Sequence, residues 1–220
     1  MCGRVVLTYS LNDLVHILKD TFYINHVPNV FVPYHYNIAP SDPLPCMIAN
    51  EGGYRLGSIP WGYPSPVTPS SGRVINIRSE KVESTAMFKD DLKNHRLVVL
   101  CNGFIEWTLD KRPFYFTYED GSLMYLAALW GKHTDGTYHC GVLTEQSQSV
   151  VKPIHERMPV ILNASETKQW LDPAQKVASL APLYHSLQHV QLTTRPLSRE
   201  VNNAKNKSES LFIEQRHFFN

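Results

Sequence analysis

Cysteine is scarce in this sequence and widely spaced. The 220 residues contain Cys2, Cys46, Cys101 and Cys140, and no two of them form a CxxC pair. Structural zinc sites and disulfide frameworks both depend on grouped cysteines. We therefore expect neither of them, and no metal or other cofactor. Free thiols persist in a reducing compartment, which predicts a cytoplasmic protein.

Long apolar runs and a charge imbalance are also missing. No segment approaches the roughly 20 apolar residues of a membrane helix, and the chain does not open with the basic-then-apolar pattern of a secretion signal. The formal net charge is +1, whereas proteins that bind nucleic acid non-specifically are usually strongly basic. Any polyanion must therefore be held by a few well-placed arginines.

The hydrophobic pattern predicts one α+β domain over residues 1–220, with no repeat or linker, and leaves the tail from about 206 unassigned. Helices are expected at 10–22, 84–94 and 163–171, the first opening on a Ser10–Asp13 capping box and the last capped by Asn163 or Ser165. Strand-like runs lie at 96–100, 114–118, 123–130, 139–144 and 189–193, and a proline- and serine-rich loop at 63–72. Because the strands outnumber the helices without alternating with them, we expect a curved antiparallel sheet.

The opening residues, MCGRVVL, place Cys2 directly behind the initiator methionine. Removal of Met1 would leave an α-amine and a thiol on adjacent carbons, with pKa values of roughly 8 and 8.5. Both groups are nucleophiles when deprotonated. The alternative is an ordinary cysteine that happens to come second.

Two short segments carry polar groups suited to ligand binding or proton transfer. In NIRSE (76–80), Asn76, Arg78 and Glu80 alternate and would share one face of an extended segment; the alternative is a surface loop with an Arg78–Glu80 ion pair. In GFIEW (103–107), bulky apolar neighbours flank Glu106, and desolvation there would raise its pKa toward that of a general acid. The alternative is a structural glutamate at a strand end.

Histidine supplies two further candidates. His155 lies in PIHERMPVIL (153–162) just before a strand-like run, and imidazole transfers protons near neutral pH. A hydrogen-bonded structural histidine is the alternative. His185 and His189 have the spacing of metal ligands on a helix, but the glutamate of an HExxH motif is missing, so we assign them no metal.

Taken together, these segments resemble the SRAP (SOS response-associated peptidase) family. The resemblance rests on seven segments in family order across residues 1 to 203: MCGR, YNIAP, WGY, NIRSE, GFIEW, IHERMPVIL and PLSREVN. It implies a mixed fold around a curved sheet or barrel-like core with flanking helices. It also implies a monomer that crosslinks itself to abasic sites in single-stranded DNA, or at single-to-double-strand junctions, as part of the DNA damage response.

The resemblance assigns roles to individual residues. Cys2 would form the crosslink as a thiazolidine, with Asn76 orienting its amine and with Glu106 and His155 transferring protons. The residues implied to contact DNA are Arg4, Pro40, Trp61, Arg78, Trp107 and Arg157.

The sequence also departs from the family pattern. A second tryptophan after Trp61 is missing, Ile105 replaces a tyrosine, Thr108 replaces a basic residue, and Ala86 lies near a position where relatives can carry arginine. These changes spare the catalytic set and affect the expected DNA contacts. An amidotransferase with an N-terminal cysteine nucleophile is a competing hypothesis, although such chains continue MCGIxG rather than MCGRVVL; a peptidase that removes its own Met1 and a silent DNA-binding module are others.

Overall fold

Four α-helices and four short 3-10 helices accompany the strands in the part of the chain that the structure describes. This computed structural model describes residues 2–28, 35–65, 72–133, 136–185 and 190–212. The α-helices are α1 (Leu11–Leu18), α2 (Ala86–Asn94), α3 (Ala164–Leu171) and α4 (Val177–His185). The 3-10 helices are η1 (Ser79–Lys81), η2 (Ser149–Val151), η3 (Arg199–Asn202) and η4 (Glu209–Phe212).

The three predicted helices form, with local differences. The amide of Asp13 donates to Ser10 Oγ and the amide of Ser10 donates to the Asp13 carboxylate, which confirms the predicted capping box at the start of α1. The helix ends earlier than predicted, at Leu18, and the chain then turns so that Phe22 is buried. Asn163, not Ser165, caps α3. Helix α4 was not predicted, because Pro182 inside it interrupts the helical pattern.

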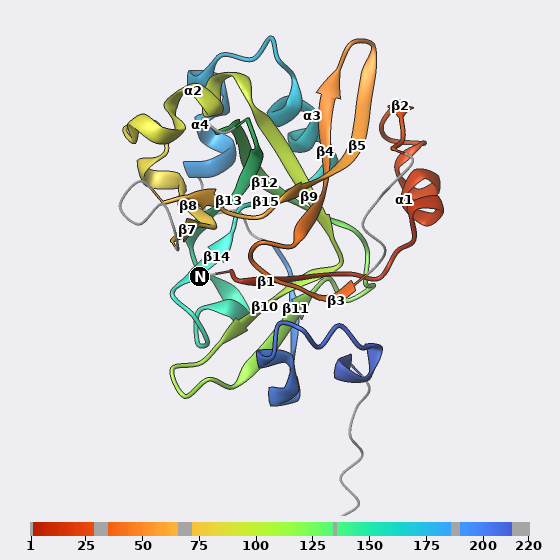
Figure 1. The fold of residues 1–220 in the computed structure, drawn as a ribbon, viewed down its shortest axis with the longest axis vertical. Helices are drawn as coiled ribbons and strands as arrows, with labels where there is room; N and C mark the ends of the chain where they lie inside the picture. Colours follow the sequence, from red (N-terminus) through yellow and green to blue (C-terminus); the bar gives the residue numbers. More distant parts are fainter. Residues whose placement is uncertain (1, 29–34, 66–71, 134–135, 186–189, 213–220) are drawn as a thin grey trace, which may run out of the picture.

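The strands form two large sheets and one small one (Figure 1). The five-stranded sheet has the order β16 (Thr193–Pro196), β11 (Pro113–Thr117), β10 (Gly103–Trp107), β1 (Arg4–Leu7), β3 (His35–Ile38). The nine-stranded sheet has the order β14 (Arg157–Pro159), β13 (Tyr138–Gln146), β12 (Met124–Lys132), β9 (Arg96–Cys101), β4 (Pro43–Asn50), β5 (Gly53–Pro60), β2 (Ile24–His26), with β15 (Ile161–Leu162) beside β12 and β8 (Asn76–Arg78) beside β13. The small sheet pairs β6 (Tyr63–Pro64) with β7 (Arg73–Val74).

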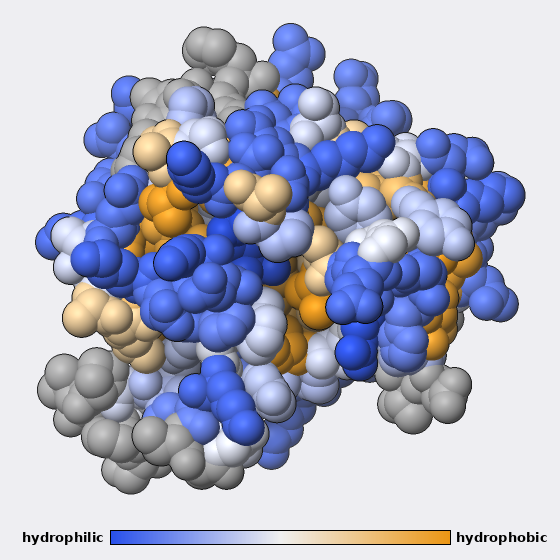
Figure 2. All heavy atoms as spheres, turned by 90° about the horizontal axis from the view of Figure 1, so that it is seen from above, coloured by the Kyte–Doolittle hydropathy of each residue, from blue (hydrophilic) through white to orange (hydrophobic). Residues whose placement is uncertain are grey.

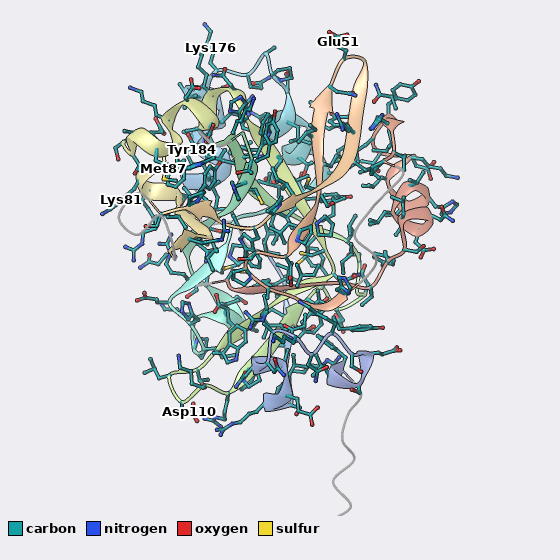
Figure 3. The ribbon with its side chains drawn as sticks, in the orientation of Figure 1. Glu51, Lys81, Met87, Asp110, Lys176 and Tyr184 are labelled. Atoms are coloured by element: carbon teal, nitrogen blue, oxygen red, sulfur yellow. The ribbon has the colours of Figure 1, made fainter. Side chains whose placement is uncertain are left out.

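These pairings confirm the α+β class and correct several details of the predicted strands and loop. The expected antiparallel sheet is mixed, because β8 pairs with β13 and β2 with β5 in parallel. The strand predicted at 189–193 is shifted, since the pairing with β11 runs from Thr193 to Pro196. Part of the predicted 63–72 loop is β6, and residues 66–71 lie outside the described residues. The β4–β5 hairpin, whose tip carries Glu51 (Figure 3), was missed because its prolines obscure the strand pattern.

One continuous segment passes from the larger sheet to the smaller at Asn102, between β9 and β10. The Asn102 side chain accepts hydrogen bonds from both the amide and the hydroxyl of Thr8 and donates to the carbonyl of Gly121. The next residue is necessarily glycine, because a Cβ at Gly103 would lie 2.1 Å from the Phe116 carbonyl oxygen. This corner determines where β10, and with it Glu106, lies relative to β1.

Two apolar clusters fill the interior. The larger includes residues of both large sheets and of all four α-helices; the smaller consists of Val6, Ile105, Tyr115, Val201 and Leu211. In Figure 1, α2, α3 and α4 gather at one end, and the five-stranded sheet and the C-terminal 3-10 helices at the other. The face in Figure 2 is mostly hydrophilic, with apolar residues visible mainly in its recesses. Among the described helices, none is long and apolar enough to cross a membrane.

Replacing Asn102 by alanine is expected to lower the free energy of unfolding by about 3–4 kcal/mol, because three side-chain hydrogen bonds worth about 1–1.5 kcal/mol each are lost. Urea denaturation measures the change. Asn94→Ala is the matched control, since Asn94 makes an exposed hydrogen bond on α2, and it should change stability by less than about 0.5 kcal/mol. Equal stability of the two variants would contradict a structural role for the corner.

Candidate functional site

The antiparallel pairing of β1 with β10 brings the start of the chain to Glu106. Arg4 pairs with Ile105 and Val5 with Phe104, so Cys2, just before β1, lies near the end of β10. The Cys2 residue is fully buried and Glu106 is 1% exposed. The two side chains are close enough for the charge of Glu106 to act on the thiol.

Asn76 holds the main chain of Cys2. Strand β8 lies parallel to β13, with Asn76 opposite Val142, and the Asn76 amide donates to the Cys2 carbonyl at 2.7 Å. The side-chain oxygen of Asn76, Oδ1, is buried and has no hydrogen-bond partner among the described residues. An acceptor is therefore available beside Cys2.

His155 completes the group. Its Nδ1 lies 3.9 Å from Oε1 of Glu106, beyond the length of a direct hydrogen bond. The Arg157 amide donates to Nδ1 at 3.0 Å, which leaves the proton of the neutral ring on Nε2. When the ring is charged, Nδ1 can donate to the Arg157 carbonyl, 3.1 Å away. Both protonation states of His155 thus have a main-chain partner.

Burial shifts the pKa of each titrating group. It raises the pKa of Glu106 to about 7. Burial, followed by the negative charge of Glu106, raises the pKa of the Cys2 thiol well above its ordinary value. Burial also lowers the pKa of His155. Near neutral pH the site therefore holds a partly protonated carboxyl, a neutral imidazole and a protonated thiol, a combination suited to transferring protons.

Trp107 and Arg4 extend the site on the other face of β10. Glu106 and Trp107 are consecutive strand residues, so their side chains point to opposite faces; Trp107 packs against the smaller apolar cluster. The Arg4 guanidinium carbon lies 5.6 Å from the centre of the Trp107 ring, a cation–π distance. The indole nitrogen donates to Asn202 Oδ1 at 2.6 Å, so the C-terminal segment orients this tryptophan.

Comparison with known proteins places this arrangement in a family. The family model for SOS response associated peptidase (SRAP) matches residues 1–204. The chain belongs to the SRAP family. Its resemblance to that family, proposed from seven segments, is confirmed.

Relatives of this SRAP chain span bacteria and vertebrates. The abasic site processing protein YoaM of Bacillus subtilis is 29% identical, over 99% of this chain and 100% of its own length. The abasic site processing protein YedK of Escherichia coli is 25% identical, over 96% of this chain and 98% of its own length. The abasic site processing protein HMCES of Xenopus tropicalis is 30% identical, over 94% of this chain and 76% of its own length.

A solved structure, of a phage-related protein from Bordetella bronchiseptica, superposes with a TM-score of 0.70 at 26% identity, covering 89% of this chain and 93% of that one. A protein from Bacteroides thetaiotaomicron shares the fold, with a TM-score of 0.75 at 16% identity, covering 90% and 92% of the two chains.

Two residues of the SRAP segments have structural roles that the sequence did not reveal. The Asn37 side chain, in YNIAP, is fully buried and donates to the carbonyls of Val201, Asn203 and Asn206. It therefore ties the C-terminal segment to β3. The second residue is Asn202, which holds Trp107. The segment PLSREVN offered no signal for this contact, because the partner of Asn202, Trp107, is distant in sequence.

Pro40 and Arg78 are accessible. Pro40 is half-buried in a turn whose next residue, Ser41, has φ 77°, a left-handed conformation that costs a non-glycine residue free energy and often marks a functional segment. Arg78 is exposed at the end of β8. Both positions suit a contact with an external ligand.

Two residues predicted to contact DNA are buried in this structure. Trp61 is fully buried and its indole nitrogen donates to the Ile75 carbonyl, so its ring is not available to stack on a base. Arg157 is 8% exposed and its guanidinium is bound to Glu80. Glu80 therefore pairs with Arg157 and not with Arg78, the partner considered from the sequence. Residues 186–189, including His189 of the HSLQH segment, lie outside the described residues.

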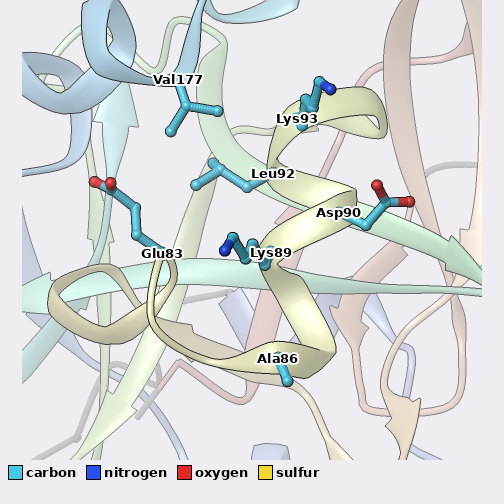
Figure 4. A pocket seen from close by; sticks show the side chains of 7 residues that line it. All are labelled: Glu83, Ala86, Lys89, Asp90, Leu92, Lys93 and Val177. Carbon is cyan, nitrogen blue, oxygen red and sulfur yellow. The ribbon is translucent and has the colours of Figure 1, made fainter.

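Other features of the described residues do not join the site. No group of three or more His, Cys, Asp or Glu side chains could hold a metal ion in the part of the chain described, and all four cysteines are buried and free. A hollow of about 540 Å³ lies between α2 and α4 (Figure 4), where Lys89, Lys93 and Ala86 line it. None of the predicted site residues lines this hollow. Ala86, which lies near a position where relatives can carry arginine, does line it.

The pKa of Glu106 predicts a specific pH dependence of stability. Its value of about 7 in the folded chain exceeds the ordinary value of about 4.3, so the folded state binds an extra proton between these values. Stability from Glu106 is full below about pH 4 and is lost as the pH rises through 7, by up to about 4 kcal/mol. Glu106→Gln should therefore gain stability over the wild type between pH 4.5 and pH 8, measured by urea denaturation.

The buried Glu145, whose pKa is also about 7, is present in both proteins, so its contribution cancels in the difference. Parallel stability curves for wild type and Glu106→Gln across this range would show that Glu106 titrates normally.

Proposed function

We propose that this SRAP protein processes abasic sites in single-stranded DNA by crosslinking itself to them through Cys2. One observation carries the proposal: Asn76 holds the main chain of Cys2 where Glu106 and His155 meet. The relatives described as abasic site processing proteins support the substrate. A site built around the first residues of the chain is otherwise hard to explain, since chain termini are usually poorly ordered.

The chemistry follows from the two nucleophiles of Cys2 once Met1 is removed. The α-amine attacks the aldehyde carbon of the open abasic sugar, and loss of one water gives an imine. The thiol sulfur then adds to the imine carbon while its proton passes to the nitrogen, which closes a five-membered thiazolidine ring. Because both nucleophiles belong to one residue, the second step is intramolecular and strongly favoured.

Glu106 and His155 move the protons that these steps require. The abasic sugar is mostly a closed hemiacetal, and its opening needs an acid and a base. A carboxyl with a pKa of about 7 can donate a proton to the sugar oxygen and later accept the proton of the thiol, whose own pKa is raised by burial. The neutral His155 accepts a proton at Nδ1 when its hydrogen bond from the Arg157 amide is replaced by a hydrogen bond to the Arg157 carbonyl. The free carbonyl oxygen of Asn76 would accept a hydrogen bond from the new α-amine.

The accessible groups around the site suit a single strand better than a duplex. Arg4 and Arg78 offer positive charge, while Pro40 and Trp107 offer flat apolar surfaces for unpaired bases. A near-neutral chain makes few phosphate contacts, so splayed bases must supply part of the binding free energy.

Of the alternatives, a peptidase activity fits the family description and would act here on Met1. The amidotransferase hypothesis loses its basis, because the SRAP match includes the MCG segment.

The purified protein is expected to begin at Cys2 and to form a covalent adduct with single-stranded DNA that carries one abasic site. Cys2→Ala should abolish the stable adduct, leaving at most an imine that borohydride traps, because the alanine amine remains. Residues added before Cys2 should also prevent the adduct, since a peptide nitrogen does not condense with an aldehyde. Intact-mass measurement detects each product.

The control for this experiment is Cys46→Ala, which removes another buried free thiol and should leave adduct formation unchanged. A full yield of adduct from the N-terminally extended protein would refute the proposed chemistry.

Binding before the chemical step is expected to depend on Arg78 and Trp107. With an abasic analogue that has no aldehyde, Arg78→Ala should reduce the slope of log affinity against log salt by about 0.7. Trp107→Ala should cost about 1–3 kcal/mol if a base stacks on the ring. Fluorescence anisotropy measures both, and Arg55→Ala, on the exposed face of β5, is the control. Equal affinity of all these variants, or of the wild type for duplex and single strand, would contradict this interface.

A further inference from the structure

The C-terminal segment, residues 198–208, runs along the five-stranded sheet (Figure 1) and is held there from both directions. The side chain of Asn37, in β3, donates to three main-chain carbonyls of this segment. In return, the Lys207 ammonium donates to the main-chain carbonyl of Asn37 and to Oδ2 of Asp42. Lys207 lies beyond residue 204, where the match to the SRAP model ends, so the family match does not account for this contact.

The Asp42 carboxylate closes the turn that carries Pro40. Its Oδ2 accepts a hydrogen bond from the Ala39 amide at 2.8 Å, and the Asp42 amide donates to the Ala39 carbonyl at 3.0 Å. The Asp42 carbonyl in turn accepts from the Trp61 amide at 3.0 Å. None of these bonds involves Lys207, so its ammonium adds a charge to a turn that other hydrogen bonds already close.

The charge of Asp42 also reaches Arg4, one of the residues proposed to contact DNA. The Arg4 guanidinium carbon lies 5.6 Å from the centre of the Trp107 ring, and Asp42 is the carboxylate whose charge acts on it. Among the described residues, no carboxylate forms an ion pair with Arg4. The guanidinium is therefore available for a phosphate, with Asp42 as the nearby competitor.

The Lys207–Asp42 ion pair is partly open to solvent. The Lys207 side chain is 29% exposed and that of Asp42 is 36% exposed. Ion pairs with this exposure contribute little to stability, so stability alone does not explain the pair, and we expect the fold to tolerate substitutions here. The pair does change the local field, because a carboxylate that faces an ammonium attracts a neighbouring guanidinium less and repels a phosphate less.

We propose that Lys207 is a positioning residue for DNA binding, which holds the Asp42 carboxylate in an ion pair and so leaves Arg4 free to bind a phosphate. The inference rests on the function proposed above and concerns its binding step. Without Lys207, the Asp42 carboxylate would pair with Arg4 or repel the phosphate that Arg4 binds. Either change would cost about one phosphate contact.

The first test needs no DNA and uses His35, in β3, as a reporter whose NMR signal is identified by its loss in His35→Gln. Burial lowers the pKa of His35, the charge of Lys207 lowers it further, and the charge of Asp42 raises it. Lys207→Met should therefore raise this pKa, and Asp42→Asn should lower it. Lys205→Met is the control: it removes an equal charge at an exposed position of the same segment and should leave the pKa unchanged.

The second test is a double-mutant cycle on the affinity for single-stranded DNA that carries the aldehyde-free abasic analogue. Lys207→Met should weaken binding about 5-fold at about 0.1 M salt and reduce the salt slope by about 0.7, the value of one phosphate contact on a single strand. In the Asp42→Asn background, the same substitution should change the affinity less than about 2-fold, because no carboxylate is left to compete for Arg4. Fluorescence anisotropy at several salt concentrations measures the cycle.

Three further measurements separate positioning from a general loss of charge or of structure. Lys207→Arg keeps the positive charge and should bind the analogue like the wild type. Lys205→Met should have the same effect on affinity with and without Asp42→Asn. In single-turnover crosslinking, Lys207→Met should raise the half-saturating DNA concentration about 5-fold and leave the rate at saturation within about 2-fold, because it acts on binding. Urea denaturation shows that each variant is folded under the assay conditions.

The outcomes distinguish this inference from the proposed function. If the wild type binds the analogue but forms no adduct with abasic DNA, the crosslinking function fails and the binding cycle still decides the role of Lys207. A wild type that does not bind single-stranded DNA overturns both.

Two results would overturn the positioning role alone. If Lys207→Met weakens binding equally in the wild-type and the Asp42→Asn backgrounds, the ammonium itself holds a phosphate. If the pKa of His35 does not respond to Lys207→Met, the C-terminal segment does not place its ammonium on Asp42 in solution.

Discussion

The antiparallel pairing of β1 with β10 is the constraint on which the rest of the site depends. A chain terminus has no covalent neighbour to hold it, and most termini are poorly ordered. Here the Arg4–Ile105 and Val5–Phe104 pairs anchor the strand directly after Cys2. The Asn102 corner fixes β10 itself, so a polar residue in the body of the protein determines where the terminus meets Glu106.

Burial then decides the chemistry of the site. The same desolvation raises the pKa of Glu106 and lowers that of His155, which brings an acid and a base into the same pH range. Such groups cost stability, because a charged carboxyl is disfavoured in an apolar interior. The larger apolar cluster, to which both large sheets and the four α-helices contribute, offsets that cost and lets the site keep its titrating groups enclosed.

Some features could be read from local sequence because local interactions cause them. The Ser10–Asp13 capping box needs only residues three apart, and the strands from 96–100 to 139–144 carry continuous apolar runs. The strand near 189–193 was misplaced because its ends depend on a partner, β11. The β4–β5 hairpin was missed because proline reduces the strand signal at positions where this sheet tolerates it.

The sequence by itself determined the family, and it predicted a reactive residue at position 2 and the residue types of a catalytic set, since each belongs to a short motif whose spacing is visible along the chain. Only the tertiary structure decided which polar groups meet. It buries Trp61 in the core and pairs Arg157 with Glu80, although the sequence predicted that both residues contact DNA. The physical reason is that exposure and ion pairing depend on distant partners: the contact that encloses Arg157 joins residues that are 77 positions apart, and no local pattern encodes it.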